Sequence, residues 1–196
     1  MPTLSLIAGP NGSGKSTLTW MVWFEGNEHI IDADAIAKRI DPLRPATAAI
    51  SAAREAILLC RNLLADMQSF TLETTLAGNG ALATLREAKS RGYRTYVCFV
   101  ALRTPELHIE RVRSRVMQGG HDIPDNDVRR RYGRSLTHAP EADVFDNSGI
   151  QPERMLMLRS GRIVWSAENL PGWVEQLRAA IERLLSSAPG GGAPGC

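Results

Sequence analysis

The chain has 196 residues, of which 43% are hydrophobic and 22% are charged, a balance typical of a globular domain with a full core. Its formal net charge of +2 is too small to indicate nucleic acid or a membrane surface as a partner. No apolar stretch reaches the roughly 20 residues of a membrane helix, and the N-terminus lacks signal-peptide features. The spacing of Cys60, Cys98 and Cys196 fits neither a zinc site nor a disulfide framework. We therefore expect a cytoplasmic protein in which Cys60 and Cys98 are buried thiols.

Predicted strands and helices alternate along the chain. Strands are expected at residues 3–8, 29–32, 69–75 and 94–102. Helices are expected at 15–24, at 47–67 after a short helix that Asp41-Pro42 ends, at 81–90, at 105–117 and at 124–138. The helix at 105–117 has a typical start, in which Thr104 caps it and Pro105 and an acid follow. A hairpin or an edge strand at 155–165 and a helix at 170–186 follow. The pattern predicts an α/β fold with a doubly wound, mostly parallel sheet and helices on both faces. We expect a single domain over residues 1–186 and a flexible tail over 187–196.

A glycine-rich turn lies near the start of the chain. Residues 7–17, IAGPNGSGKST, match the phosphate-binding pattern G-x-x-x-x-G-K-[ST] between a predicted strand and a predicted helix. The glycines let backbone N–H groups converge on a polyphosphate, and the helix N-terminus adds partial positive charge. A dinucleotide fingerprint is excluded because Thr17 stands where its third glycine would be. We predict nucleotide contacts from Gly9, Asn11, Gly12, Ser13, Gly14, Lys15, Ser16 and Thr17, with Ser16 as a ligand of Mg²⁺.

The other motifs favour phosphoryl transfer over a switch or a motor. The chain has neither the N-K-x-D stretch of switch GTPases nor the long apolar strand ending in Asp-Glu of motor ATPases. Small-molecule kinases instead need an acid near the acceptor hydroxyl and arginines over the phosphates. The residues leave two alternatives open: a kinase of a nucleoside, a simple sugar or an antibiotic, and an ATP-dependent regulatory switch without phosphotransfer.

Acidic residues follow two of the predicted strands. We expect Asp34, in the stretch IDAD, to accept the proton of the acceptor hydroxyl, and Asp32 to cap the next helix or to contact Mg²⁺ through water. Capping by both aspartates is the alternative. Glu73 ends another strand and is expected to contact Mg²⁺ through water or to hold substrate hydroxyls. Further candidates for substrate contact are Thr74, Thr75 and Glu55.

Arginines are dense between residues 111 and 134. Arg111 and Arg115 share one helix face, and like charges at this spacing repel unless an anion lies among them. A triphosphate suits such a cluster, so we expect a helical, arginine-rich lid with phosphate contacts from Arg111, Arg115, Arg130 and Arg131. Two solvated helix faces are the alternative. Residues 143–149, DVFDNSG, are expected to form a loop in which Asn147 lies beside the nucleotide base, with a simple turn as the alternative. His121 is a further candidate for phosphate contact.

Taken together, the stretches GPNGSGKST, IDADAIAKRIDP, FTLETTLAG, ERVRSRVMQGGHDIPDNDVRRRY and DNSG resemble the zeta toxin family in a short, stand-alone bacterial form. The resemblance spans residues 7–149 and implies a P-loop kinase fold that uses ATP, or GTP, with Mg²⁺. Well-studied members phosphorylate the 3′-hydroxyl of UDP-N-acetylglucosamine, so this or a related nucleotide sugar is the implied acceptor. The resemblance to a toxin also allows a separate antitoxin protein as a partner.

The resemblance also implies roles for individual residues. By position, Lys15 matches the family's phosphate-loop lysine, Asp34 its catalytic aspartate and Arg111 its first phosphate-binding arginine. The family's second phosphate-binding arginine could correspond to Arg115, Arg130 or Arg131. We assign the catalytic role to Arg131. Glu55 loosely matches the acid that holds the sugar.

Overall fold

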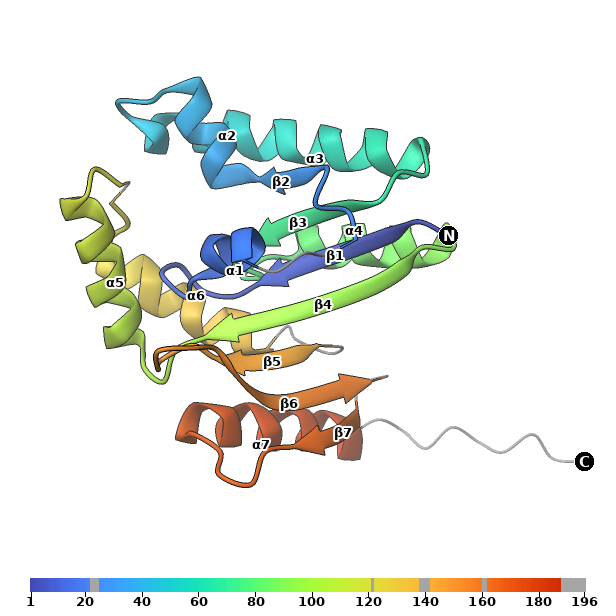
Figure 1. Cartoon of the computed structure of the whole chain (residues 1–196), viewed down its shortest axis with the longest axis vertical. Helices are drawn as coiled ribbons and strands as arrows, with labels where there is room; N and C mark the ends of the chain where they lie inside the picture. Colours follow the sequence, from blue (N-terminus) through green and yellow to red (C-terminus); the bar gives the residue numbers. More distant parts are fainter. Residues whose placement is uncertain (22–24, 121, 138–141, 160–161, 188–196) are drawn as a thin grey trace, which may run out of the picture.

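A computed structural model describes residues 1–21, 25–120, 122–137, 142–159 and 162–187, and within them the chain forms one twisted sheet with helices on both sides (Figure 1). The strands lie in the order β2-β3-β1-β4-β5-β6-β7. Their bounds are Thr3–Ala8 for β1, Ile30–Asp32 for β2, Phe70–Thr74 for β3, Arg94–Ala101 for β4, Asp143–Asp146 for β5, Glu153–Arg159 for β6 and Arg162–Ser166 for β7. Strands β1 to β5 pair in parallel, and β6 and β7 add an antiparallel edge. The predicted doubly wound, mostly parallel sheet is confirmed.

Helices connect the strands of the parallel part of the sheet, and a final helix follows β7. They are α1 (Lys15–Met21), α2 (Ala33–Ile40), a 3₁₀ turn (Pro45–Ala48), α3 (Ala49–Ala65), α4 (Asn79–Ser90), α5 (Pro105–Met117), α6 (Asp125–Thr137) and α7 (Gly172–Ser187). In Figure 1, α1 lies in front of the sheet, α4 and α7 lie behind it, and α5 stands beyond the carboxyl ends of the strands. The hydroxyl of Thr104 accepts a hydrogen bond from the Leu107 N–H, so a polar cap followed by Pro105 starts α5 as the sequence predicts.

The centre of the sheet is apolar. All six residues of β1 are buried, and β1 pairs with β3 on one side and β4 on the other. Phe70 of β3 and Phe99 of β4 are completely buried in the main core. The predicted burial of Cys60 and Cys98 is also confirmed. Because the parallel strands run in one direction, their carboxyl ends meet at a single edge, where ligands bind in open α/β sheets.

One predicted element needed correction, and one open alternative was resolved. Residues 143–146 were expected in a loop but form β5, whose aspartates gain partners that the sequence does not reveal. The Asp143 carboxylate accepts a hydrogen bond from the Tyr96 hydroxyl at 3.1 Å, and the Asp146 carboxylate accepts one from the Arg103 guanidinium at 3.2 Å. The alternative of a hairpin or an edge strand at 155–165 is resolved as the β6–β7 hairpin. The predicted ends of two helices, at residues 22–24 and 138, lie outside the described residues.

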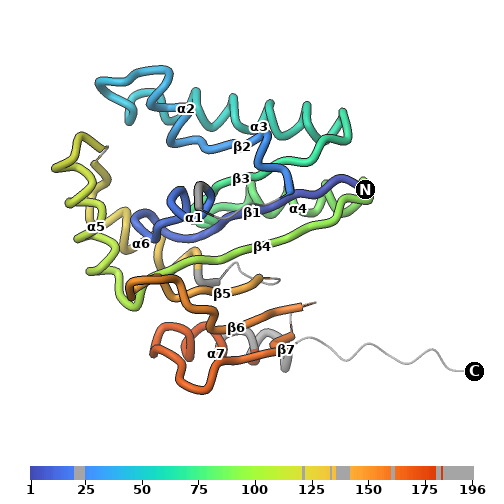
Figure 2. Tube along the Cα trace, viewed as in Figure 1, coloured from blue at the N-terminus to red at the C-terminus, as the bar shows by residue number. Residues whose placement is uncertain are grey.

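The backbone trace brings two distant segments together at the carboxyl edge. The glycine-rich turn after β1 and the α5–α6 segment lie side by side at this edge (Figure 2). Hydrogen bonds across a separation of 97 and 120 residues join them. Among the described residues, no helix has both the length and the apolar character needed to cross a membrane.

Candidate active site

The glycine turn is held by direct contact between backbones. Gly9 has φ of 147°, and a Cβ added there would lie 2.0 Å from the carbonyl oxygen of Val100 in β4. Gly12 has φ of 76°, and its Cβ would lie 2.7 Å from the carbonyl oxygen of His108 in α5. Any side chain at these two positions would force the loop away from the sheet or from α5. The glycines are therefore required by the packing of the loop against the sheet and α5.

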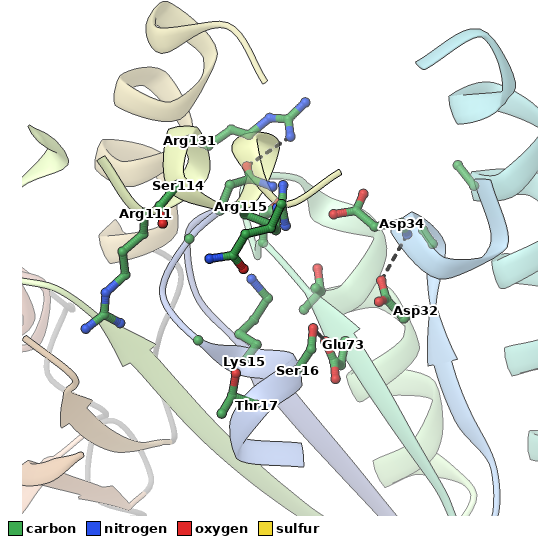
Figure 3. A pocket seen from close by; sticks show the side chains of 18 residues that line it. Lys15, Ser16, Thr17, Asp32, Asp34, Glu73, Arg111, Ser114, Arg115 and Arg131 are labelled. Atoms are coloured by element: carbon green, nitrogen blue, oxygen red, sulfur yellow. Dashed lines mark hydrogen bonds between the residues drawn. The ribbon is translucent and has the colours of Figure 1, made fainter. Parts of the chain in front are cut away.

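A cavity of about 730 Å³ opens above this loop (Figure 3). Its walls come from the loop, the start of α2, the end of β3, and the helices α5 and α6. Most of the predicted site residues line it, namely Asn11, Gly12, Gly14, Lys15, Ser16, Thr17, Asp32, Asp34, Glu73, Thr74, Thr75, Arg111, Arg115 and Arg131. Segments separated by a hundred residues in the sequence thus contribute to one chamber.

The predicted lysine lies against the loop. Its ammonium group donates hydrogen bonds to the carbonyl oxygens of Gly9 at 2.8 Å and of Pro10 at 3.1 Å. Burial lowers the pKa of Lys15, while the negative charges of Glu73 and Asp34 act in the opposite direction. The acids across the cavity therefore help to keep this amine protonated.

Carboxylates and a hydroxyl gather opposite the lysine. The Ser16 hydroxyl donates a hydrogen bond of 2.9 Å to Glu73, which is only 7% exposed. Asp32 caps α2 as the sequence suggested, because its carboxylate accepts a hydrogen bond of 2.9 Å from the Asp34 N–H. The pKa of Asp32 is raised to about 6, first by burial and then by repulsion from Glu73 and Asp34. This cluster would be stabilised by a cation.

The oxygen atoms of Ser16, Glu73 and Asp32 fit a Mg²⁺ ion shared with nucleotide phosphates better than a metal held by protein ligands alone. Mg²⁺ is usually held by one or two carboxylates or hydroxyls together with water and substrate phosphates. Ser16, with Glu73 hydrogen-bonded to it and Asp32 nearby, supplies such a set. Within the described parts of the chain, no group of three or more His, Cys, Asp or Glu side chains could hold a metal by itself. The residues therefore fit an ion that arrives with a nucleotide.

The arginines of the predicted lid occupy different places. The guanidinium of Arg111 donates a hydrogen bond of 2.7 Å to the backbone oxygen of Asn147, and that of Arg131 donates one of 3.0 Å to the Asn11 side chain. Arg115 lines the cavity between them. Arg130 does not line it, since its exposed guanidinium forms an ion pair of 2.8 Å with Asp127.

Asn147 and Glu55 are placed very differently with respect to the cavity. Asn147 supports the loop from outside, because its side-chain amide donates a hydrogen bond of 2.8 Å to the Ser13 carbonyl oxygen. Glu55 forms an ion pair with Arg39 and lies outside the residues that line the cavity. The further candidate His121 lies outside the described residues.

A second cavity, of about 560 Å³, adjoins the first on the side of α2. The two share the walls formed by Asp32, Ala33, Asp34, Arg115 and Arg131. The second extends past Lys38 and the 3₁₀ turn to the segment before α6. Asp34 therefore stands at the boundary between a chamber beside the glycine loop and a chamber with room for another molecule.

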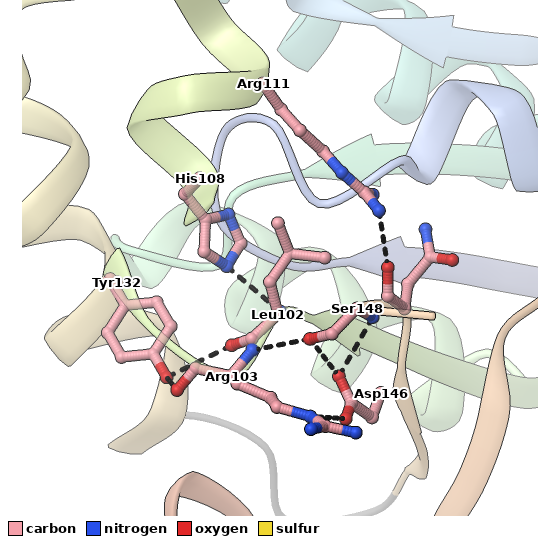
Figure 4. Close-up of polar contacts among 8 residues, drawn as sticks. Leu102, Arg103, His108, Arg111, Tyr132, Asp146 and Ser148 are labelled. Carbon is pink, nitrogen blue, oxygen red and sulfur yellow. Dashed lines mark hydrogen bonds and ion pairs between the residues drawn. The ribbon is translucent and has the colours of Figure 1, made fainter. Parts of the chain in front are cut away.

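Sequence reasoning missed His108 of α5. Its side chain is completely buried and lies between the glycine loop and the end of β4 (Figure 4). No motif marks this residue, because a single histidine in an amphipathic helix pattern has no characteristic neighbour spacing. Its partners become visible only when α5 is placed against the loop.

The raised pKa of Asp32 predicts a dependence of stability on pH. The folded chain keeps this proton up to about pH 6, whereas the unfolded chain releases it near 3.8, so folding becomes less favourable as pH rises through that interval. In Asp32→Asn the cap is retained but the titration is removed. We expect the free energy of unfolding of the wild type to fall relative to that of the variant between about pH 4 and pH 6 and to stay level above. Urea unfolding of both proteins across this range measures the free energy of unfolding. If it changed with pH equally in both, the raised pKa of Asp32 would be contradicted.

Solved structures of other proteins share this fold. A structure of the AvrRxo1-ORF1:-ORF2 assembly with ATP has a TM-score of 0.67 at 12% identity, covering 98% of this chain and 66% of the other. The PezAT toxin–antitoxin system of Streptococcus pneumoniae gives 0.57 at 15% identity, over 95% and 87%. A putative kinase from Chloroflexus aurantiacus gives 0.51 at 18% identity, over 68% and 80%. At sequence identities this low, the similarity shows a shared fold and nothing further.

Sequence comparison identifies the family. An uncharacterised protein of Haemophilus influenzae is 36% identical over 124 residues, which are 63% of this chain and 88% of that protein. The family model described as zeta toxin matches residues 1–149, a span that contains the glycine loop, the carboxylates and all the arginines of the cavity. The protein belongs to the zeta toxin family.

Proposed function

We propose that this protein is a kinase that transfers the γ-phosphoryl group of ATP, with Mg²⁺, to a hydroxyl of a small acceptor. The observation that carries the proposal is the position of Asp34. Its carboxylate faces the cavity from the wall opposite Lys15, at the boundary with the second chamber (Figure 3). A nucleotide on the glycine loop and an acceptor in the second chamber would meet at this carboxylate.

The residues of the loop would hold the nucleotide. Its backbone N–H groups would donate hydrogen bonds to the phosphates, and the start of α1 would attract them through its partial positive charge. Lys15 adds a full positive charge at the same place. Ser16, with Glu73 and Asp32 behind it, would hold Mg²⁺, which neutralises phosphate charge when bound. The alternative donor, GTP, would use the same contacts.

Asp34 would act as the base. As the acceptor oxygen forms its bond to the γ-phosphorus, the acceptor O–H proton passes to the Asp34 carboxylate and the bond between the γ-phosphorus and the bridging oxygen of ADP breaks. Arg115 and Arg131, which line both chambers, would stabilise the charge spread over the transferring group. Arg111 would instead cover the nucleotide near Asn147.

The acceptor we favour is UDP-N-acetylglucosamine or a related nucleotide sugar, as implied by the family. Membership of the zeta toxin family and the PezAT structure among the fold relatives support a toxin with a separate antitoxin. ATP as donor is supported by the structure of the AvrRxo1-ORF1:-ORF2 assembly with ATP. A nucleoside, a simple sugar or an antibiotic remains the alternative acceptor.

Purified protein incubated with labelled ATP and a panel of acceptors tests the substrate. The panel contains UDP-N-acetylglucosamine, its free sugar, nucleosides and an aminoglycoside. We expect label on the nucleotide sugar and none on the nucleosides. Transfer to nucleosides alone would refute the nucleotide-sugar assignment, and transfer to none with slow ATP hydrolysis would favour the regulatory switch.

Replacing the base tests the mechanism. In Asp34→Asn the amide has nearly the same shape but cannot take the acceptor proton, so we expect turnover to fall at least about 10²-fold while the dissociation constant for ATP changes little. Single-turnover assays and calorimetric titration with ATP measure the two quantities. If the variant turned over as fast as the wild type, Asp34 would not be the base and a switch would become the better description.

A matched pair of arginine variants tests the lid. Arg131→Ala removes a cation that lines both chambers, and we expect turnover to fall by about 10²-fold. Arg130→Ala removes an exposed partner of Asp127 outside the cavity, and a change below about threefold is expected. Equal losses in both variants would show that the helix face as a whole, rather than Arg131, acts on the phosphates.

A further inference from the structure

His108 is completely buried on α5, and the proposed mechanism does not use it. Its Nε2 lies 3.0 Å from the backbone nitrogen of Leu102, which directly follows β4. Its Nδ1 lies 2.7 Å from the backbone oxygen of Asn11 in the glycine loop. One imidazole ring therefore connects the end of the central strand with the loop (Figure 4).

The two partners fix the tautomer of this ring. A backbone N–H can only donate a hydrogen bond and a carbonyl oxygen can only accept one. Nε2 of His108 must therefore accept from Leu102, and Nδ1 must carry the proton that is donated to Asn11. Burial lowers the pKa of His108 to about 4, and the positive charges of Lys15 and Arg111 act in the same direction.

The bond to Asn11 determines where the next N–H points. The described residues contain no cis peptide bond, and in a trans peptide the C=O and N–H groups point in opposite directions. Because the Asn11 carbonyl is turned toward His108, the N–H of Gly12 is turned away from it. Rotation of this peptide group by half a turn would exchange the donor for a carbonyl oxygen, which repels phosphate.

The ring has little freedom to move. The His108 carbonyl oxygen would lie 2.7 Å from a Cβ on Gly12, so the helix backbone already touches the loop. The ring of Tyr132, from α6, meets the imidazole edge-on with the ring centroids 5.2 Å apart. The Tyr132 hydroxyl is itself held by the carbonyl oxygens of Leu102 and Arg103, each at 3.3 Å.

We infer that His108 is a positioning residue whose Nδ1–H holds the peptide group between Asn11 and Gly12 in the orientation that binds phosphate. The inference rests on the proposed nucleotide site and deepens it. His108 acts through Asn11 and does not contact the nucleotide. The same ring joins the loop to α5. It thereby fixes the distance of Arg111 and Arg115 from the phosphate-binding loop.

Two substitutions separate the two hydrogen bonds of the ring. In His108→Asn the amide nitrogen can take the place of Nδ1, which retains the bond to Asn11 and loses the acceptor for Leu102. In His108→Gln the longer side chain can bring its oxygen to the place of Nε2, which retains the bond to Leu102 and loses the donor to Asn11. His29→Gln, at an exposed residue before β2, is the matched control.

The readout is the dissociation constant for Mg·ADP and Mg·ATP, measured by calorimetry beside the melting temperature. We expect His108→Gln to bind both nucleotides at least about tenfold more weakly than His108→Asn, although both lower the melting temperature. A merely structural role predicts equal affinities for the two variants at similar loss of stability, and that result would overturn the inference. Absence of nucleotide binding by the wild type would instead refute the proposed function.

A measurement on the wild type keeps the inference falsifiable if the variants do not fold. Nitrogen-15 NMR of the ring distinguishes the tautomers, and we expect a neutral His108 with its proton on Nδ1 at neutral pH, with that proton in a strong hydrogen bond before and after Mg·ADP is added. A proton on Nε2, or loss of the bond when Mg·ADP binds, would overturn the inference.

Discussion

The close contact of the glycine loop with β4 and α5 is the constraint on which the site depends. At Gly9 and Gly12 the loop backbone lies so near to two carbonyl oxygens that no side chain fits between them. This contact leaves the loop with buried polar groups that must be paired. Lys15 bonds the carbonyl oxygens of Gly9 and Pro10, while Asn147 and His108 hold those of Ser13 and Asn11 from neighbouring elements.

Opposed charges then organise the cavity. Carboxylates come from the ends of β2 and β3 and from the start of α2, whereas guanidinium groups come from α5 and α6. Burial and then repulsion from the other acids raise the pKa of Asp32, and burial lowers the pKa of Lys15. A nucleotide with its Mg²⁺ would relieve both, because its phosphates face the cations while its metal faces the acids.

The arrangement also separates arginines that look alike in the sequence. Arg130 and Arg131 are neighbours, and both lie within 4 Å of Asp127, but only Arg131 also reaches Asn11 and lines the cavity. Successive helical residues point about 100° apart, so only one of the two can face the loop once α6 is docked. Which of them faces it depends on how Tyr132 and the adjacent residues pack, and not on the local sequence.

The sequence by itself determined the α/β class, the glycine loop, the acids at the strand ends and the capped start of α5, because these depend on short-range patterns and on the shared direction of parallel strands. Only the tertiary structure decided that residues 143–146 are a strand, that Glu55 pairs with Arg39 away from the cavity, and that His108 supports the loop. Each of these depends on a partner distant in the chain, such as Tyr96 for Asp143 or Asn11 for His108, and local propensity carries no information about such partners.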